Sequence, residues 1–153
     1  MARMDDIPEP TRTAVLALPI APVAAQAFVA GPPLAQRRVA LVSSAALFRR
    51  GEAPFLPGSG EYRALPVDLP LEDILMSHVS INFDRSGWQR DLNVAYPIDR
   101  LHELTAEGVI GEVASTHYSV MGSTDPQAMA ASADAIAARM RAEGVGGAIL
   151  SPV

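Results

Sequence analysis

Two amphipathic segments of helical spacing alternate with three short apolar segments in the second half of this sequence. The helical segments cover 97–107 and 124–143, and the apolar segments cover 91–96, 112–120 and 148–150. Gly108 and Gly144 follow the two helical segments, as expected of residues that end helices with a positive φ. An order of strand, helix, strand, helix, strand is typical of right-handed crossovers that build a parallel sheet. We therefore predict an α/β fold with an open, mostly parallel sheet and helices on its faces, similar to flavodoxin or Rossmann folds.

The first core strand is expected at Arg38–Ser43, an apolar and β-branched run typical of a strand buried on both faces. A chain of this length fits one domain, so we assign residues 38–153 to the α/β domain and residues 1–37 to a lead-in. The lead-in contains an apolar stretch from Ala14 to Ala30 that has some features of a signal peptide or a membrane helix. Two prolines interrupt this stretch and acidic residues precede it, so we predict a proline-bent segment lying across the domain surface.

The composition excludes several classes of protein. The sequence has no cysteine, which excludes a disulfide framework, thiolate-bound zinc and a catalytic thiol among these residues. Its net charge is −5 and it has no long block of like charges, so nothing in it favours binding to nucleic acid. We expect a cytoplasmic protein with neither a nucleic-acid nor a membrane partner.

Two motifs that could carry chemistry are in the wrong context. Gly144–Gly147 looks like a phosphate-binding loop, but it follows a helix and precedes a strand, the reverse of the order that a dinucleotide site needs. It is interpreted as a helix stop. Ser43 and Ser44 follow a strand, but they lack the flanking glycines of a nucleophile elbow, which argues against a serine hydrolase.

The histidines show no spacing typical of a metal site. His102 lies on the segment 97–107 without a second histidine one turn away, so we interpret it as a solvated helix residue. His78 lies in the long aperiodic segment 70–89, and His117 comes near the end of a predicted strand. Both could face the carboxyl edge of the sheet, where open parallel sheets bind ligands. Taken singly, each is more typical of a hydrogen-bonded structural histidine.

Six segments of the sequence follow one another in the order and at the spacing found in a known family. They are Val42–Phe55 (VSSAALFRRGEAPF), Ser77–Ser80 (SHVS), Asn82–Asn93 (NFDRSGWQRDLN), Pro97–Leu104 (PIDRLHEL), Gly108–Gly111 (GVIG) and His117–Gly122 (HYSVMG). In succession they resemble the selenoprotein B subunits of the glycine, sarcosine, betaine and D-proline reductase family. The resemblance covers most of the chain.

The resemblance implies where the reactive residue belongs. In similar family members, a strand like Gly147–Val153 is followed directly by selenocysteine or cysteine, and a second cysteine comes a few residues later. This chain has neither, so no catalytic residue and no bound cofactor is expected within it. Because UGA encodes selenocysteine and is ordinarily read as stop, we hypothesise that the reading frame is cut at an in-frame UGA after Val153. The fold would then be incomplete at its carboxyl end.

The family resemblance also implies a reductase that cleaves the carbon–nitrogen bond of an amino-acid-like substrate by selenol or thiol attack, with dithiols restoring the reduced state. Other reductase subunits or a dithiol donor would be partners, and a homo-oligomer is possible. We predict that the substrate pocket is lined by His78, Asp84, Asp91, Asn93, His117 and Tyr118. The alternative is a complete, non-catalytic α/β module that binds a small molecule or serves as a partner subunit. A fragment, unlike a finished domain, should expose an apolar sheet edge and self-associate.

Overall fold

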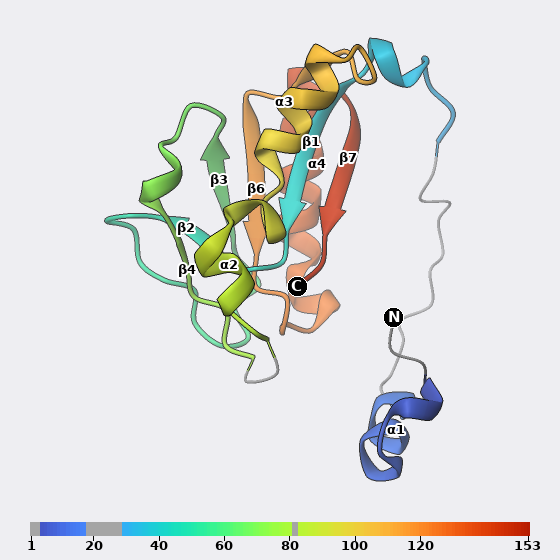
Figure 1. Cartoon of the computed structure of the whole chain (residues 1–153), viewed down its shortest axis with the longest axis vertical. Coiled ribbons are helices and arrows are strands. Elements are labelled where there is room, and N and C mark those ends of the chain that lie inside the picture. Colours follow the sequence, from blue (N-terminus) through green and yellow to red (C-terminus); the bar gives the residue numbers. More distant parts are fainter. Residues whose placement is uncertain (1–3, 18–28, 81–82) are drawn as a thin grey trace.

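The computed structural model of the protein describes residues 4–17, 29–80 and 83–153 (Figure 1). The strands are β1 (Arg38–Ser43), β2 (Leu47–Arg49), β3 (Tyr62–Pro66), β4 (Ile74–Met76), β5 (Glu112–Val113), β6 (Thr116–Val120) and β7 (Val145–Ser151). The α-helices are α1 (Glu9–Leu16), α2 (Ser86–Arg90), α3 (Ile98–Ala106) and α4 (Ala130–Glu143). The 3₁₀ helices are η1 (Met4–Asp6), η2 (Leu34–Gln36), η3 (Leu71–Asp73), η4 (Leu92–Val94) and η5 (Pro126–Met129).

The amino-terminal segment contains η1, α1 and η2. The predicted proline-bent stretch falls mainly on residues 18–28, which lie outside the described residues. None of the helices in the described ranges is both long and apolar enough to cross a membrane. The division into a lead-in and a domain at residue 38 stays a prediction.

Strand β1 is the centre of the larger sheet and pairs in parallel on both sides. Along one side, Arg38 and Val39 pair with β5, and Val42 and Ser43 pair with β6. Along the other side, β1 pairs over its whole length with β7, which α4 connects to β6. Strand β3 is antiparallel to β6, and β2 and β4 form a separate antiparallel pair. The predicted α/β fold with a mostly parallel sheet is confirmed, but its sheet is mixed because of β3.

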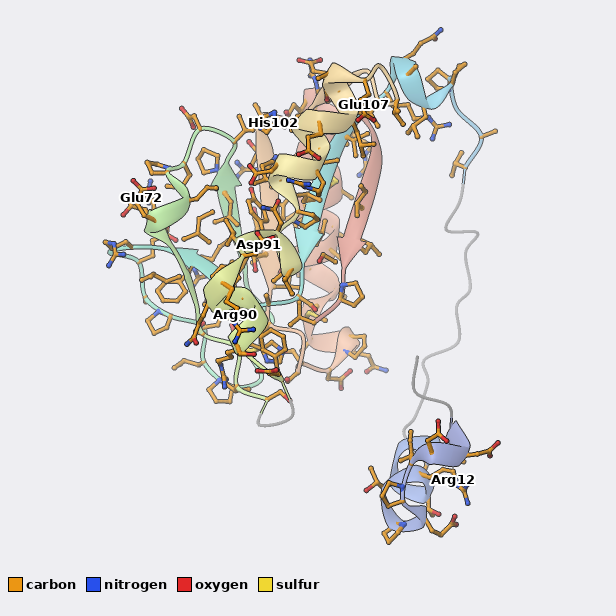
Figure 2. The ribbon with its side chains drawn as sticks, in the orientation of Figure 1. Arg12, Glu72, Arg90, Asp91, His102 and Glu107 are labelled. Carbon is orange, nitrogen blue, oxygen red and sulfur yellow. The ribbon has the colours of Figure 1, made fainter. Side chains whose placement is uncertain are left out.

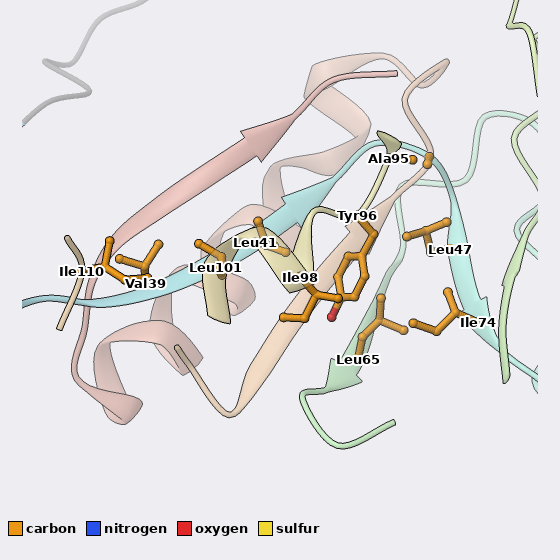
Figure 3. Close-up of a cluster of buried hydrophobic side chains, with 11 residues drawn as sticks. Val39, Leu41, Leu47, Leu65, Ile74, Ala95, Tyr96, Ile98, Leu101 and Ile110 are labelled. Carbon is orange, nitrogen blue, oxygen red and sulfur yellow. The ribbon is translucent and has the colours of Figure 1, made fainter. Parts of the chain in front are cut away.

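The two faces of the sheet are covered differently. Helices α2 and α3 lie over one face, and α4 lies over the other (Figure 1). The main core fills the space under α3 and η4 (Figure 3), and its largest fully buried members are Leu41, Leu47, Leu65, Tyr96 and Leu101. On the opposite face, Ile136 is the one residue of α4 that is buried. The α4 side of the sheet is therefore the more thinly packed.

Residues 91–96, predicted as a strand, form η4 and the turn that leads into α3. The Asp91 carboxylate accepts a hydrogen bond from the backbone N–H of Asn93 at 2.9 Å, which starts this helical turn. Ala95 and Tyr96 are buried, so the apolar residues in this run pack into the core without belonging to a sheet. The strand prediction was wrong because a short apolar run does not distinguish a strand from other buried segments.

The predicted strand 112–120 is real but broken. It forms β5 and β6, and the break at Ala114 and Ser115 leaves the backbone N–H of Leu41 without a carbonyl partner in the ladder. The imidazole of His117 takes that place, because its Nδ1 accepts this hydrogen bond at 3.0 Å. A buried side chain thus completes the pairing of the central strand.

The predicted helix ends are confirmed. Gly108 follows α3 with a φ of 72°, and Gly144 ends α4 with a φ of 75°. The segment from Gly144 leads directly into β7, as expected of a helix stop and not of a phosphate loop. Before α4, the Asp125 carboxylate accepts a hydrogen bond from the N–H of Gln127 and caps η5, with proline in its first turn.

Candidate functional site

The carboxyl ends of β1, β6 and β7 meet at Ser44. Its backbone N–H donates to the carbonyl of Ser151 at 3.1 Å, and its carbonyl accepts from the N–H of Gly122 at 2.9 Å. Its hydroxyl oxygen accepts from the N–H of Val153 at 2.9 Å. A side chain at position 122 would come within 2.9 Å of the Ser44 carbonyl oxygen, so glycine permits this close approach. One residue therefore connects all three strands at the edge where open parallel sheets bind ligands.

The turn after β1 uses its backbone amides internally. The N–H of Ala45 donates to the Ser43 hydroxyl at 3.2 Å, and that of Leu47 donates to the Ser119 hydroxyl at 2.7 Å. The N–H of Ala46 donates to a carbonyl of β6 at 2.9 Å. Ala46 has a φ of 54°, a left-handed conformation that is unusual for a residue with a side chain. This turn offers no free amides to hold an anion, which agrees with the absence of a phosphate-loop pattern.

An apolar groove lies beside these strand ends. One part, of about 310 Å³, separates α4 from the sheet, and a second part, of about 190 Å³, continues toward Ser151 and Pro152. The two parts share Val42, Val120 and Leu150 in their walls. No charged side chain lines either part. The groove therefore suits aliphatic groups better than the ammonium and carboxylate of an amino acid.

His78 is buried close to the same edge. Ser77, which precedes it, donates from its backbone N–H to the carbonyl of Ala46 at 3.0 Å. The His78 Nδ1 accepts from the N–H of Ser80 at 3.2 Å, and the Arg85 guanidinium donates to the His78 carbonyl. Burial, and then the charge of Arg85, lower the pKa of His78. Its Nε2 is buried and has no hydrogen-bond partner among the described residues, and the same is true of the Nε2 of His117.

Three other candidates make local hydrogen bonds around α2, with Asp84 at its start and with Asp91 and Asn93 after its end. Asp84 accepts hydrogen bonds from the backbone and the hydroxyl of Ser86, and Asp91 accepts from Asn93. These bonds lower the pKa values of both carboxyl groups. Asn93 also donates to the carboxylate of Asp99 at 2.8 Å and accepts from its N–H at 3.0 Å, which ties η4 to the start of α3. Asp91 and Asn93 are thus brought together, at the surface where α2 ends (Figure 2).

His117 and Tyr118 lie on opposite faces of the sheet. The His117 ring packs edge-on against Tyr96, 5.7 Å between ring centres, and burial lowers its pKa to about 4. The Tyr118 hydroxyl is hydrogen-bonded to Arg139 of α4, and burial raises its pKa. Successive residues of a strand point to opposite faces, so the two side chains do not enter one cavity.

His102 is exposed on α3, as predicted for a solvated helix histidine, and Figure 2 shows it on that helix, with Glu107 directly after the helix ends. Within the described ranges, no three histidine or acidic side chains lie close enough together to hold a metal ion.

Comparison with known proteins assigns the chain to a protein family. The family model described as "Glycine/sarcosine/betaine reductase selenoprotein B" matches residues 61–153, which is more than half of the sequence. The chain belongs to this family. The matched region runs from the residue before β3 to Val153, two residues after β7 ends, and it does not include β1 or Ser44.

A relative extends the match toward the amino terminus. The chain is 29% identical over 116 residues to D-proline reductase subunit gamma of Acetoanaerobium sticklandii. This alignment covers 74% of the chain but only 47% of the relative, so the chain spans about half the length of the curated relative. No solved structure matches the chain.

The residues that sequence reasoning missed are Ser44 and Gly122. Ser44 was considered only as a possible nucleophile, and its structural role depends on contacts with residues far away in the sequence. A pair of serines directly after a buried strand was the available signal, because hydroxyl groups readily replace backbone partners where a strand ends.

Replacing Asn93 with alanine should destabilise the α2–α3 segment of this selenoprotein B family member. The change removes hydrogen bonds to Asp91 and Asp99, so we expect the free energy of unfolding to fall by about 1 to 2 kcal/mol. Asn93→Asp should lower the free energy of unfolding at least as much at neutral pH, because it places a third carboxylate beside those of Asp91 and Asp99. The loss should be smaller in acid, where carboxylates become protonated. Urea unfolding at pH 7 and pH 4 measures both changes. Equal stability of the three proteins would contradict the bridging role.

Proposed function

We propose that this chain forms part of a reductase subunit that cleaves a carbon–nitrogen bond of an amino-acid-like substrate with a selenol or thiol nucleophile. The observation that carries the proposal is the selenoprotein B family match, which extends to Val153. The net reaction adds two electrons and two protons across the carbon–nitrogen bond, which releases the amine of an open-chain substrate or opens the ring of a cyclic one. A dithiol that is oxidised to a disulfide supplies these electrons and protons, whether directly or through other reductase subunits.

The nucleophile would be held at the carboxyl edge of the sheet. Because the chain has no cysteine, the selenol or thiol would come from residues outside it. The hydrogen bond from the Val153 N–H to Ser44 would hold a residue that follows Val153 beside the ends of β1 and β6. The attacking group must be the anion, and η5 and α4 begin just after β6, where helix amino termini favour negative charge.

The side chains proposed to contact substrate differ in what they offer. His78 has a buried, unpartnered Nε2, which supports a role in orienting the substrate or passing a proton to the leaving amine. Asp84, Asp91 and Asn93 flank α2, which begins a few residues after His78, and the two carboxylates would suit a substrate ammonium group. His117 and Tyr118 would act by supporting the strands, since both are fully buried on opposite faces.

The proposal is tested by sequencing the gene beyond the codon for Val153 and by an assay of reductase activity. If the codon after Val153 is UGA and an open frame with an early cysteine follows, the longer product should be purified with its co-purifying subunits. It should consume glycine, sarcosine, betaine or D-proline with dithiothreitol as reductant. Disulfide formation should match amine release for the three open-chain substrates and the appearance of the ring-opened amino acid for D-proline. The 153-residue chain alone should be inactive. Failure of the longer product on all four substrates, beside an active D-proline reductase control, would refute the proposal.

A second candidate, a non-catalytic binding module or partner subunit, is favoured by the absence of cysteine from the chain. A UAA or UAG codon after Val153 would support it. In that case the 153-residue chain should be monodisperse on size exclusion.

A further inference from the structure

The outer edge of β7 has no partner strand among the described residues. β7 pairs with β1 on one side only. The Ser151 carbonyl faces β1, where it accepts from Ser44, so strand alternation turns the backbone groups of Ala148 and Leu150 to the open side. Natural sheet edges are usually protected by charged side chains or prolines. Residues 145–151 contain neither. Arg37 donates to the Gly146 carbonyl at 3.4 Å and so covers the start of this edge, whereas the part from Ala148 to Leu150 has the character of an internal strand.

Apolar side chains are also uncovered along this strand. Leu150 is 72% exposed and Ile149 is 38% exposed. Leu150 forms a wall of both parts of the apolar groove under α4. The open strand edge and the open groove are therefore continuous at Leu150 and form one surface, which we call the β7 surface.

The chemistry of the β7 surface selects its occupant. An amino-acid substrate carries charges that the uncharged groove does not match. A β-strand in which every second side chain is apolar fits both the open strand edge and the apolar groove. Its backbone would pair with Ala148 and Leu150, and one of its apolar side chains would enter the groove. The curated relative has more than half of its length outside the aligned part, so subunits of this family contain polypeptide that could supply such a strand.

We propose that the β7 surface is where the other half of the same kind of subunit packs, adding a strand to β7 and seating an apolar side chain beside Leu150. The occupant is the part of the subunit that corresponds to the unaligned part of D-proline reductase subunit gamma. This inference rests on family membership and on the exposed surface, and it does not depend on the proposed catalysis.

The test is co-expression of the full 153-residue chain, carrying an affinity tag, with the unaligned part of D-proline reductase subunit gamma. Expression in the same cells lets each polypeptide fold in the presence of the other. Leu150→Arg is the test variant. Leu56→Arg is the matched control, because Leu56 is 71% exposed but lies in the loop between β2 and β3, far along the chain from β7. Circular dichroism should show that both variants remain folded, since both leucines are already in water.

The unaligned part should co-purify with the tagged chain and with Leu56→Arg, and Leu150→Arg should abolish co-purification. In the complex, the amide hydrogens of Ala148 and Leu150 should exchange about tenfold more slowly, or slower still, than in the chain alone. The proposal is overturned if the two polypeptides do not co-purify, or if Leu150→Arg has no effect on the complex. It is also overturned if, during co-expression, the chain pairs with a second copy of itself through β7 in place of the unaligned part, because a second copy would then be the occupant. Each of these results is independent of any reductase assay.

Discussion

Replacing His117 with alanine should lower the free energy of unfolding at pH 7 by about 3 to 5 kcal/mol. The imidazole Nδ1 accepts the backbone N–H of Leu41 in the central strand, and both residues are fully buried. The substitution leaves that N–H unpaired away from water and opens a cavity beside Tyr96. His117→Asn is the matched control, because its side-chain oxygen can take the position of Nδ1. Guanidinium unfolding of the three proteins should rank wild type first, His117→Asn second and His117→Ala last.

The same residue should make the protein sensitive to acid. Burial lowers the pKa of His117 to about 4 from an ordinary value of 6.5, although the charge of Glu143 opposes the shift. Between these two pH values the unfolded chain binds the proton and the folded chain does not, so stability falls as the pH falls from 6.5 to 4. The full loss is about 3 kcal/mol, and below pH 4 this residue adds nothing further.

His78 shifts in the same direction and contributes to the same loss. The contribution of His117 is isolated by His117→Asn, which cannot titrate. Unfolding free energies measured at intervals from pH 4 to pH 7 should show a smaller slope for this variant. Parallel curves for wild type and His117→Asn would contradict the assignment of the acid sensitivity to His117.

Replacing Gly60 with alanine should destabilise the protein by about 3 kcal/mol, at the upper end of the cost of overpacking. A Cβ at this position would overlap the carbonyl oxygen of Ala128 and lie 2.9 Å from its carbonyl carbon. The obstacle is backbone of η5, which cannot move aside as a flexible side chain would. Gly60 and its neighbour also anchor the start of α4, since Ser132 donates to the Gly60 carbonyl at 2.6 Å and Thr124 donates to the Ser59 carbonyl at 3.0 Å.

Gly87→Ala is the control for Gly60→Ala. Position 87 lies in α2, and a Cβ there would be 3.6 Å from the nearest side-chain atom, Val94 Cγ1, which is an ordinary contact. Alanine is a better helix former than glycine, so this variant should be neutral or stabilised by up to about 1 kcal/mol. The midpoint of thermal unfolding should therefore fall for Gly60→Ala and stay the same or rise for Gly87→Ala. A neutral Gly60→Ala would show that α4 does not start against this loop.

The parts of the fold that were predicted correctly depend on neighbours along the chain. The ends of α3 and α4 at Gly108 and Gly144 are local conformational preferences, and the cap at Asp125 joins residues two positions apart. The strand at Arg38–Ser43 was predicted because burial on both faces leaves a continuous apolar run. Residues 91–96 carried a similar run, but the hydrogen bond between Asp91 and Asn93 turned it into η4.

The candidate site was less predictable than the fold. The contact between Asp91 and Asn93 follows from their closeness in the sequence, whereas the burial of His78 depends on folding. The separation of His117 from Tyr118 follows from strand alternation, once their strand is known to lie between α3 and α4. Their use as substrate ligands stays a proposal.

The sequence by itself determined the order β1, α3, β6, α4 and β7, the positions where the long helices stop and the family resemblance, because these depend on local preferences and on matched residue types. Only the tertiary structure decided which groups meet at the carboxyl edge of the sheet. Ser44 and Val153 are 109 residues apart, and His117 and Leu41 are 76 residues apart. Such pairs form because parallel pairing of β1 with β6 and β7 brings distant segments into register, and each contact then satisfies a backbone N–H that the ladder leaves open.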